Sequence, residues 1–340
     1  KKKKNTQTYT VTVASDGGQN KYRFDGNSTY APTLSLQEGG TYTFDWSAAT
    51  THPFSFSTTS DGTHNSGTEY TVGVVKDTDA YTTTITVAHG APTLYYYCSS
   101  HSGMGGQANT TETHGSTNLK GSIQSVVSAN QDAGFSIVSW TGDGNSGATV
   151  GHGLSQTPEV IWVKNRDTSD IWTTVHPDLS ADHVIYLHLA NGQNSSAASF
   201  GSHTNQVIGV DTDTATNKLD SKMIAYCFHS VEGYSKFGSF AGNSNANGTF
   251  VHLGFRPAYV ILKQNANGVD WSLFDSKRLG LNVDNNNLRA FAATAAAEQT
   301  DNDIDFVANG FKCRRNFANN QGTVLYFAWA EQPFKFANAR

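Results

Sequence analysis

The stretch Pro158-Glu-Val-Ile-Trp-Val-Lys164 recurs 99 positions later as Pro257-Ala-Tyr-Val-Ile-Leu-Lys263. Further pairs keep the same offset: Phe135 with Tyr234, and Trp172 with Trp271. Several matches at one fixed offset indicate an internal duplication. The β-branched and aromatic residues of each stretch are typical of buried strands.

The two copies span residues 135–233 and 234–333, inside a segment that we place at 123–340. Strand-like residues cross the join without a linker, so we expect one pseudo-duplicated β-sandwich. Near the end of each copy the offset becomes 100, which would match Ile224-Ala-Tyr-Cys-Phe228 with Val324-Leu-Tyr-Phe-Ala328. The one helical candidate is the short, Ala-rich segment 289–298.

Residues 5–108 form a second region, in which apolar and polar residues alternate. Tyr9-Thr-Val-Thr-Val13 and Thr41-Tyr-Thr-Phe44 are examples, and Asp-Gly and Gly-Gly turns separate such runs. Period-two alternation between turn signals predicts an antiparallel β-sandwich. Residues 109–122 contain almost no apolar side chain, and we expect them to be a linker. The predicted fold class is therefore all-β.

The composition excludes several classes of protein. Charged residues make up 15% of the chain, the formal net charge is −5, and Gly occurs 32 times, whereas good helix formers are scarce. A mainly helical protein is excluded, and without a basic stripe we expect no nucleic-acid partner. No apolar run is long enough for a membrane helix, so we expect no membrane partner. The motifs of hydrolases and nucleotide-binding enzymes are absent, and we expect no enzymatic activity.

The motif with the most specific chemistry is Cys98-Ser-Ser-His101-Ser-Gly-Met104, directly after a predicted strand. His52 lies upstream, at the start of another predicted strand. A thiolate, two imidazoles and a thioether form the donor set of a blue-copper site, and a Cys with two His can also bind zinc. We therefore predict a metal site at His52, Cys98, His101 and Met104, for copper before zinc. A sandwich of the same fold that binds no metal is the alternative.

These residues resemble those of the cupredoxins, in particular the amicyanin type with its short Cys-x2-His-x2-Met loop. The resemblance covers about residues 8–106. It implies a sandwich of seven or eight strands with His52, Cys98, His101 and Met104 as copper ligands. Pro53 departs from the family, in which the first His is usually followed by an Asn that ties down the ligand loop.

Other polar and aromatic residues have simpler interpretations. We expect His64 to be a solvated loop residue. Three alternating carboxylates could bind calcium, but a polar solvent face is the preferred interpretation: Asp301, Asp303 and Asp305. The six Trp residues could form a sugar platform, but core packing is preferred. Cys227 and Cys313 are expected to be buried free thiols.

A second resemblance involves Val231-Glu-Gly-Tyr-Ser-Lys-Phe-Gly-Ser239 and Gly254-Phe-Arg-Pro-Ala258. With segments 148–166 and 333–340, they resemble an uncharacterised β-domain of virion and tail-fibre proteins from tailed phages, especially those of marine bacteria. The resemblance implies a structural protein at the virion surface, outside the cell, such as a fibre, a tail appendage or a capsid decoration.

Such proteins assemble under symmetry, so we expect a homo-oligomer, a trimer or a lattice, in contact with other virion proteins. Two alternatives stay open. One is an extracellular or periplasmic blue-copper electron carrier, and the other is a carbohydrate-binding adhesin for glycans of the host surface.

Overall fold

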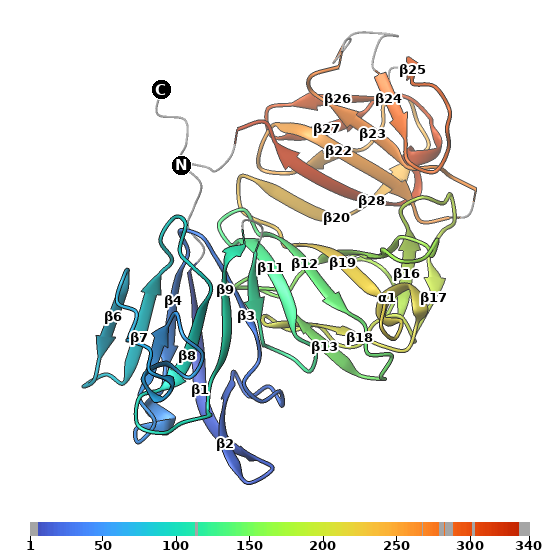
Figure 1. Ribbon diagram of the computed structural model, residues 1–340. Coiled ribbons are helices and arrows are strands. Elements are labelled where there is room, and N and C mark those ends of the chain that lie inside the picture. Colours follow the sequence, from blue (N-terminus) through green and yellow to red (C-terminus); the bar gives the residue numbers. More distant parts are fainter. Residues whose placement is uncertain are drawn as a thin grey trace. The chain divides into compact units, whose positions relative to one another are not determined.

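The computed structural model describes residues 6–112, 115–266, 268–278, 282, 288–300 and 303–332. Nearly all of its regular structure is β-strand, as the sequence predicts. The chain divides into two compact units (Figure 1). The first unit comprises residues 1–130, 136–141 and 148–153, and the second comprises 131–135, 142–147 and 154–340.

The first unit contains a sandwich of two sheets. A five-stranded sheet has the order β2-β1-β4-β7-β6, and a four-stranded sheet has the order β3-β9-β8-β5. Their strands are β1 (Thr6–Asp16), β2 (Gln19–Phe24), β3 (Leu34–Gln37), β4 (Thr41–Asp45), β5 (Phe54–Ser57), β6 (Val74–Asp77), β7 (Thr82–Thr86), β8 (Leu94–Cys98) and β9 (Gly106–Glu112). The same unit also contains β10 (Ser116–Asn118), β11 (Ser125–Asn130), most of β12 (Phe135–Thr141) and β13 (Ala148–Gly151).

Alternation along the strands builds the core of this sandwich. In β4, Tyr42 and Phe44 are fully buried, while Thr41 and Thr43, which alternate with them, are half-buried. The ring of Phe44 stacks on that of Phe54, from the opposite sheet, at a centroid distance of 4.5 Å. Two strand pairs, β1 with β4 and β3 with β9, run parallel. The sandwich is therefore confirmed, but its sheets are mixed rather than antiparallel throughout, because alternation alone does not encode which strands become neighbours.

The expected linker at 109–122 is also wrong. Strand β9 extends to Glu112, and β10 lies within the same range. Ser116 and Thr117 are fully buried and have hydrogen-bond partners. Tyr42 Oη lies 2.5 Å from Ser116 Oγ, the Thr117 hydroxyl oxygen accepts from the Ser35 amide at 2.6 Å, and Tyr9 Oη donates to the Thr117 carbonyl oxygen at 2.5 Å. Polar side chains can be buried when they have such partners, which a count of apolar residues does not reveal.

The second unit contains two sheets with the same strand order. The strands β19-β14-β15-β16-β17 are consecutive neighbours in the first copy, and β28-β22-β23-β24-β25 are consecutive neighbours in the second. Their bounds are β14 (Val160–Asn165), β15 (Thr173–Val175), β16 (His183–Tyr186), β17 (Asn194–Ser195), β19 (Lys222–Phe228), β22 (Pro257–Gln264), β23 (Ser272–Asp275), β24 (Leu288–Phe291), β25 (Gln299–Thr300) and β28 (Gln321–Ala330). The other strands of this unit are β18 (Val207–Val210), β20 (Ser235–Asn243), β21 (Phe250–His252), β26 (Ile304–Val307) and β27 (Gly310–Cys313).

The register repeats together with the order. Ile161 pairs with Val175 in the first copy, and Val260 pairs with Phe274 in the second, so both partners shift by 99. Lys164 and Lys263 occupy matching strand ends, where each ammonium donates to the carbonyl oxygen of the last strand residue and to one in the loop that follows. The predicted duplication is therefore visible in the hydrogen-bond ladders.

At the end of the copies the offset is 101 rather than the expected 100. Trp162 pairs with Tyr226, and its counterpart Ile261 pairs with Phe327. Tyr226 and Phe327 both belong to the same apolar cluster between the two sheets. A shift of one residue would place these side chains on opposite faces, so packing selects the odd offset.

Segment 289–298 is not helical, which corrects the sequence-based expectation. Strand β24 occupies its first part, and Ser272 pairs there with Phe291. The α-helix α1 (Thr214–Asn217) lies elsewhere, and the Asp213 carboxylate caps it by accepting from the Ala215 amide. Within the described residues no helix has the length and apolar character needed to span a bilayer.

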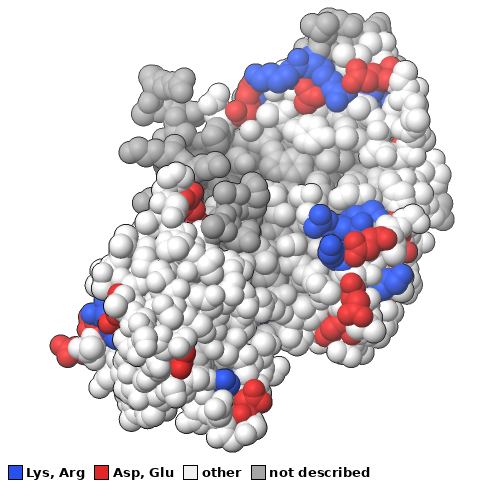
Figure 2. Space-filling view, in the orientation of Figure 1, with Lys and Arg blue, Asp and Glu red and all other residues white. Residues whose placement is uncertain are grey.

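Charged side chains on the face shown in Figure 2 form small groups in which Lys and Arg lie beside Asp and Glu. Most of that face is uncharged, in line with the low charged fraction of the sequence. Cys227 and Cys313 are buried free thiols, as expected. Burial raises the pKa of the Cys313 thiol to about 12.

Candidate metal centre

The register of two strands brings His52 to Cys98. Strands β5 and β8 pair antiparallel, with Phe54 opposite Cys98. Because neighbouring antiparallel strands run in opposite directions, the start of β5 lies beside the end of β8. His52 precedes β5 by two residues, and Cys98 is the last residue of β8. The Ser99 amide also donates to the Pro53 carbonyl oxygen at 3.0 Å, which closes this edge.

Three ligand atoms converge there. The Nδ1 atom of His52 lies 3.9 Å from Cys98 Sγ, and the Nδ1 atom of His101 lies 3.6 Å from it. The two imidazole rings are 4.7 Å apart between centroids. Within the described part of the chain, these three residues form the group of His, Cys and acidic side chains that could hold an ion.

The three residues differ in exposure. Cys98 is fully buried, His52 is partly buried, and His101 is exposed. Burial lowers the pKa of His52 below its ordinary value, and the neighbouring His101 lowers it further. The centre therefore has an apolar inner side and one imidazole at the surface.

Met104 lies on the inner side. It is 1% exposed and belongs to the same apolar cluster as Cys98 and Phe54. Its backbone carbonyl oxygen accepts from the Tyr22 amide at 3.0 Å, which fixes the end of the ligand loop on β2. The structure thus brings His52, Cys98 and His101 into one cluster and places Met104 in the core that contains Cys98.

The separations suit one metal ion. An ion bound to imidazole nitrogen at about 2.0–2.1 Å and to thiolate at about 2.3 Å keeps the two ligand atoms about 3.3–4.0 Å apart. The observed nitrogen–sulfur distances, 3.6 and 3.9 Å, lie inside that interval. Both nitrogen–sulfur separations therefore fit a single ion bound to the thiolate of Cys98.

Tyr22 supports the buried side of the centre. Its hydroxyl group donates to the carbonyl oxygen of His52 at 2.7 Å. Burial raises the pKa of this phenol far above its ordinary value, and the neighbouring Cys98 raises it further. The hydroxyl therefore stays protonated and holds the backbone of His52 in place.

Two residues that sequence reasoning did not assign to the site hold the ligand loop. The Nε2 atom of His64 lies 2.9 Å from the Cys98 carbonyl oxygen, and the Asp61 carboxylate accepts from the Gly103 amide at 2.9 Å. His64 is exposed, as expected, but it is not merely solvated. These contacts join positions 34 and 42 residues apart, so no local sequence signal could have revealed them.

The same contacts explain how the ligand loop is held although Pro53 follows His52, where the cupredoxins usually have an Asn. Its carbonyl oxygen binds the Ser99 amide on one side of the ligand loop, and His64 and Asp61 bind the loop on the other. Lys21 adds a fourth contact, from its ammonium to the Gly103 carbonyl oxygen at 2.5 Å. The loop is therefore tied down through backbone groups, without an Asn after the first His.

The remaining candidates are structural. Asp303 is fully buried and pairs with Arg289 at 2.7 Å, and Asp305 pairs with Arg314 at 3.0 Å, so the expected polar solvent face is wrong for Asp303. Asp301 lies outside the described residues. Trp46, Trp140 and Trp271 are buried, in agreement with core packing.

Residues 107–333, about two thirds of the chain, match the model of a family described as a domain of unknown function, DUF7483. No curated protein and no solved structure matches the chain. His52, Cys98, His101 and Met104 all precede the matched region. The family match therefore does not cover the candidate centre, and the chemistry of the centre is inferred from the geometry of these four residues.

Proposed function

The chain belongs to the DUF7483 family, and we propose that its N-terminal unit adds to this domain a centre that binds one copper ion through His52, Cys98, His101 and Met104. The observation that carries the proposal is the approach of His52 to Cys98. Cys98, His101 and Met104 share one loop and would be close in any fold, whereas His52 reaches the site through strand pairing.

Each residue has a distinct role in the proposal. Cys98 supplies the thiolate from the buried side, and His52 and His101 supply two imidazole nitrogens. Met104 supplies a weak thioether ligand from the core. Copper bound by such a set would provide one-electron redox chemistry, with a potential set by the weak ligand and by the apolar surroundings of the sulfur.

The donor set favours copper over zinc. Structural zinc sites use four strong ligands, whereas this site has three strong donors and one thioether. Two imidazoles, a thiolate and a distant thioether are the set that copper uses for electron transfer. The exposed imidazole of His101 gives the centre an edge through which a redox partner could exchange electrons, as the alternative role of an electron carrier requires.

Copper binding is tested by titrating the full chain with Cu(II) and recording visible absorption. We expect one ion per chain and an intense thiolate-to-copper band that Cys98→Ser abolishes. Cys227→Ala and Cys313→Ala are matched controls, since both residues are buried free thiols outside the site, and both should keep the band. Stoichiometric binding of zinc at these residues with no coloured copper complex would overturn the copper assignment. Absence of binding by both ions would overturn the metal site.

For the whole chain we propose a structural role at the surface of a phage particle, as a homo-oligomer in contact with other virion proteins. The resemblance of segments 231–239 and 254–258 to virion β-domains supports this role, together with the low charge and the duplicated sandwich. Mass spectrometry and immunogold labelling of purified particles test it. Detection of the chain only in the periplasm or the medium of uninfected cells would favour the electron carrier instead.

A further inference from the structure

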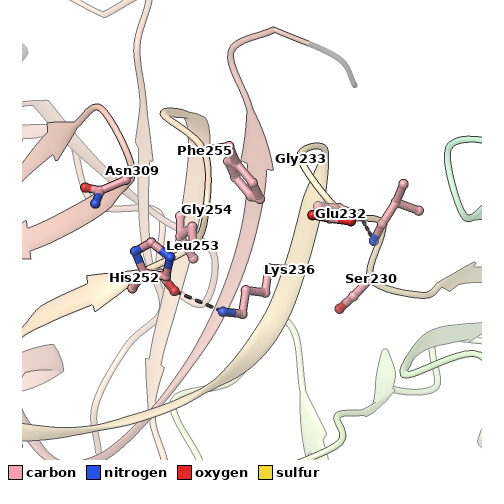
Figure 3. Close-up of a pocket in the computed structure, with 11 residues that line it drawn as sticks. Ser230, Glu232, Gly233, Lys236, His252, Leu253, Gly254, Phe255 and Asn309 are labelled. Atoms are coloured by element: carbon pink, nitrogen blue, oxygen red, sulfur yellow. Dashed lines mark hydrogen bonds between the residues drawn. The ribbon is translucent and has the colours of Figure 1, made fainter. Parts of the chain in front are cut away.

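A pocket of about 570 Å³ opens on the second unit. It lies among three segments: the turn between β19 and β20, the residues after β21, and the turn between β26 and β27 (Figure 3). Its volume is in the range of small-molecule sites. The side chains that give it chemical character are Glu232, Lys236, His252, Phe255 and Asn309.

The duplication provides an internal comparison for this pocket. At the 99-residue offset, Glu232 and Lys236 correspond to Ala133 and Ile137. The turn between them keeps its glycine in both copies, Gly134 and Gly233, and both have positive φ. The first copy thus forms this turn without the two charged side chains of the second. The fold alone does not explain why Glu232 and Lys236 are present.

Lys236 is poised to bind an anion. In the described part of the chain its ammonium has one hydrogen-bond partner, the His252 carbonyl oxygen at 3.0 Å, and no carboxylate within ion-pair distance. Figure 3 shows the Lys236 side chain reaching across the pocket to that oxygen. An ammonium has three donors, so two remain for a ligand.

The walls around Lys236 are held in place by backbone contacts. The amides of Leu253 and Gly254 both donate to the Asn309 carbonyl oxygen, at 2.9 and 3.1 Å, and leave the Asn309 amide side chain at the rim. On the other side, Val231 and Ser235 exchange backbone hydrogen bonds at 3.1 and 2.9 Å. Such preorganisation lowers the entropic cost of binding.

The combination of groups selects the ligand. Phe255 and Leu253 give the pocket an apolar wall, and Asn309, His252 and Glu232 offer both donors and acceptors. Hydroxyl groups, which donate and accept, suit such a mixture. A polyphosphate does not, because Lys236 is the one Lys or Arg in the lining and Glu232 repels further negative charge. A single carboxylate matches the single ammonium.

We propose that this pocket binds a sugar unit that carries a carboxylate, with Lys236 pairing with the carboxylate and Asn309, His252 and Glu232 contacting hydroxyl groups. The site is independent of the metal centre, since its lining lies entirely between residues 230 and 309.

The test compares an acidic glycan with its neutral core. The full chain is titrated in a calorimeter with 3′-sialyllactose, with a tetramer of galacturonic acid, and with lactose. We expect millimolar or tighter binding of at least one acidic probe and at least tenfold weaker binding of lactose. A charge-assisted hydrogen bond has about the strength that such a tenfold difference requires.

Two lysine variants locate the site. Lys236→Met should weaken binding of the acidic probe at least tenfold. Lys312→Met is the matched control, because Lys312 is also half-buried, also donates to one carbonyl oxygen at 3.0 Å (that of Gly248), and does not line the pocket. It should leave binding unchanged. The proposal is overturned if neither acidic probe binds at 10 mM, if lactose binds equally well, or if Lys236→Met and Lys312→Met bind alike.

Discussion

The Nδ1 atom of His52 lies 3.9 Å from the Sγ atom of Cys98, although 46 positions separate the two residues in the chain. The pairing of β5 with β8 creates this proximity. Metal affinity should therefore depend on the sandwich as well as on the loop.

Replacement of His52 by Ala should abolish tight metal binding while the first unit stays folded. The backbone carbonyl oxygen that Tyr22 binds is retained in this variant, so the local fold keeps its hydrogen bond. We expect copper affinity to fall by more than about 100-fold, beyond the effect of losing an outer contact. Calorimetric titration measures the affinity, and thermal unfolding checks the fold. His89→Ala, at a side chain that is 96% exposed, is the control. Equal copper affinity in both variants would contradict the site.

Replacement of His64 by Ala should weaken metal binding without removing a ligand. The variant loses the hydrogen bond to the Cys98 carbonyl oxygen, so the ligand loop is held less firmly. Loss of an outer contact of this kind costs about 10- to 100-fold in affinity. His64→Gln keeps a donor at this position and should recover most of the affinity. If His64→Ala binds copper as tightly as the unmodified chain, the loop does not need this contact.

Much of the architecture follows from the sequence, because period-two alternation reports directly on which side chains face a core. Tyr42 and Phe44 in β4 illustrate this, since both lie at the expected inward positions. The sequence did not predict which strands are neighbours. The parallel pairing of β1 with β4 and of β3 with β9 depends on contacts between distant residues, which alternation does not encode.

The candidate site was likewise predictable only in part from the sequence. Donor type and spacing were enough to nominate His52, Cys98, His101 and Met104. His64 could not be recognised, because its role depends on one hydrogen bond to a backbone oxygen on another loop. Thr117 was misread for a related reason, since the partner of its buried hydroxyl group is the amide of Ser35, 82 positions away in the chain.

The second unit should lose stability in mild acid through His176. This imidazole is buried and neutral: Nδ1 accepts from the Asp178 amide, and Nε2 bonds to the Tyr326 carbonyl oxygen. Burial lowers its pKa from 6.5 to about 4. Between these values the unfolded chain binds a proton that the folded chain does not, so stability is full above pH 6.5 and falls as the pH approaches 4. The loss amounts to roughly 3 kcal/mol.

Urea unfolding of the full chain, followed at pH 7 and pH 4.5, measures this effect. His176→Phe should be less stable at pH 7, because it leaves the Asp178 amide and the Tyr326 carbonyl oxygen without their partner. It should also show a smaller loss of stability between the two pH values. The exposed His252, replaced by Gln, serves as the control and should keep the full loss. An unchanged pH dependence in His176→Phe would show that other groups cause the acid sensitivity.

The duplicated lysines should respond differently to alkaline pH. Lys263 is fully buried, and burial lowers the pKa of its ammonium from 10.5 to about 8. Between these values the unfolded chain holds a proton that the folded chain has released, so this group makes folding more favourable as the pH rises, by about 1.4 kcal/mol per pH unit at most. Replacement by Met should remove this gain, which a comparison of unfolding free energies at pH 8 and pH 10 measures.

Lys164→Met, at the equivalent position of the first copy, is the matched variant. Lys164 is half-buried and donates to three carbonyl oxygens, those of Asn165, Thr168 and Asp170. Lys164→Met leaves Lys263 in place and should retain the gain between pH 8 and pH 10. If Lys263→Met also retains it, the buried ammonium is not the group that titrates.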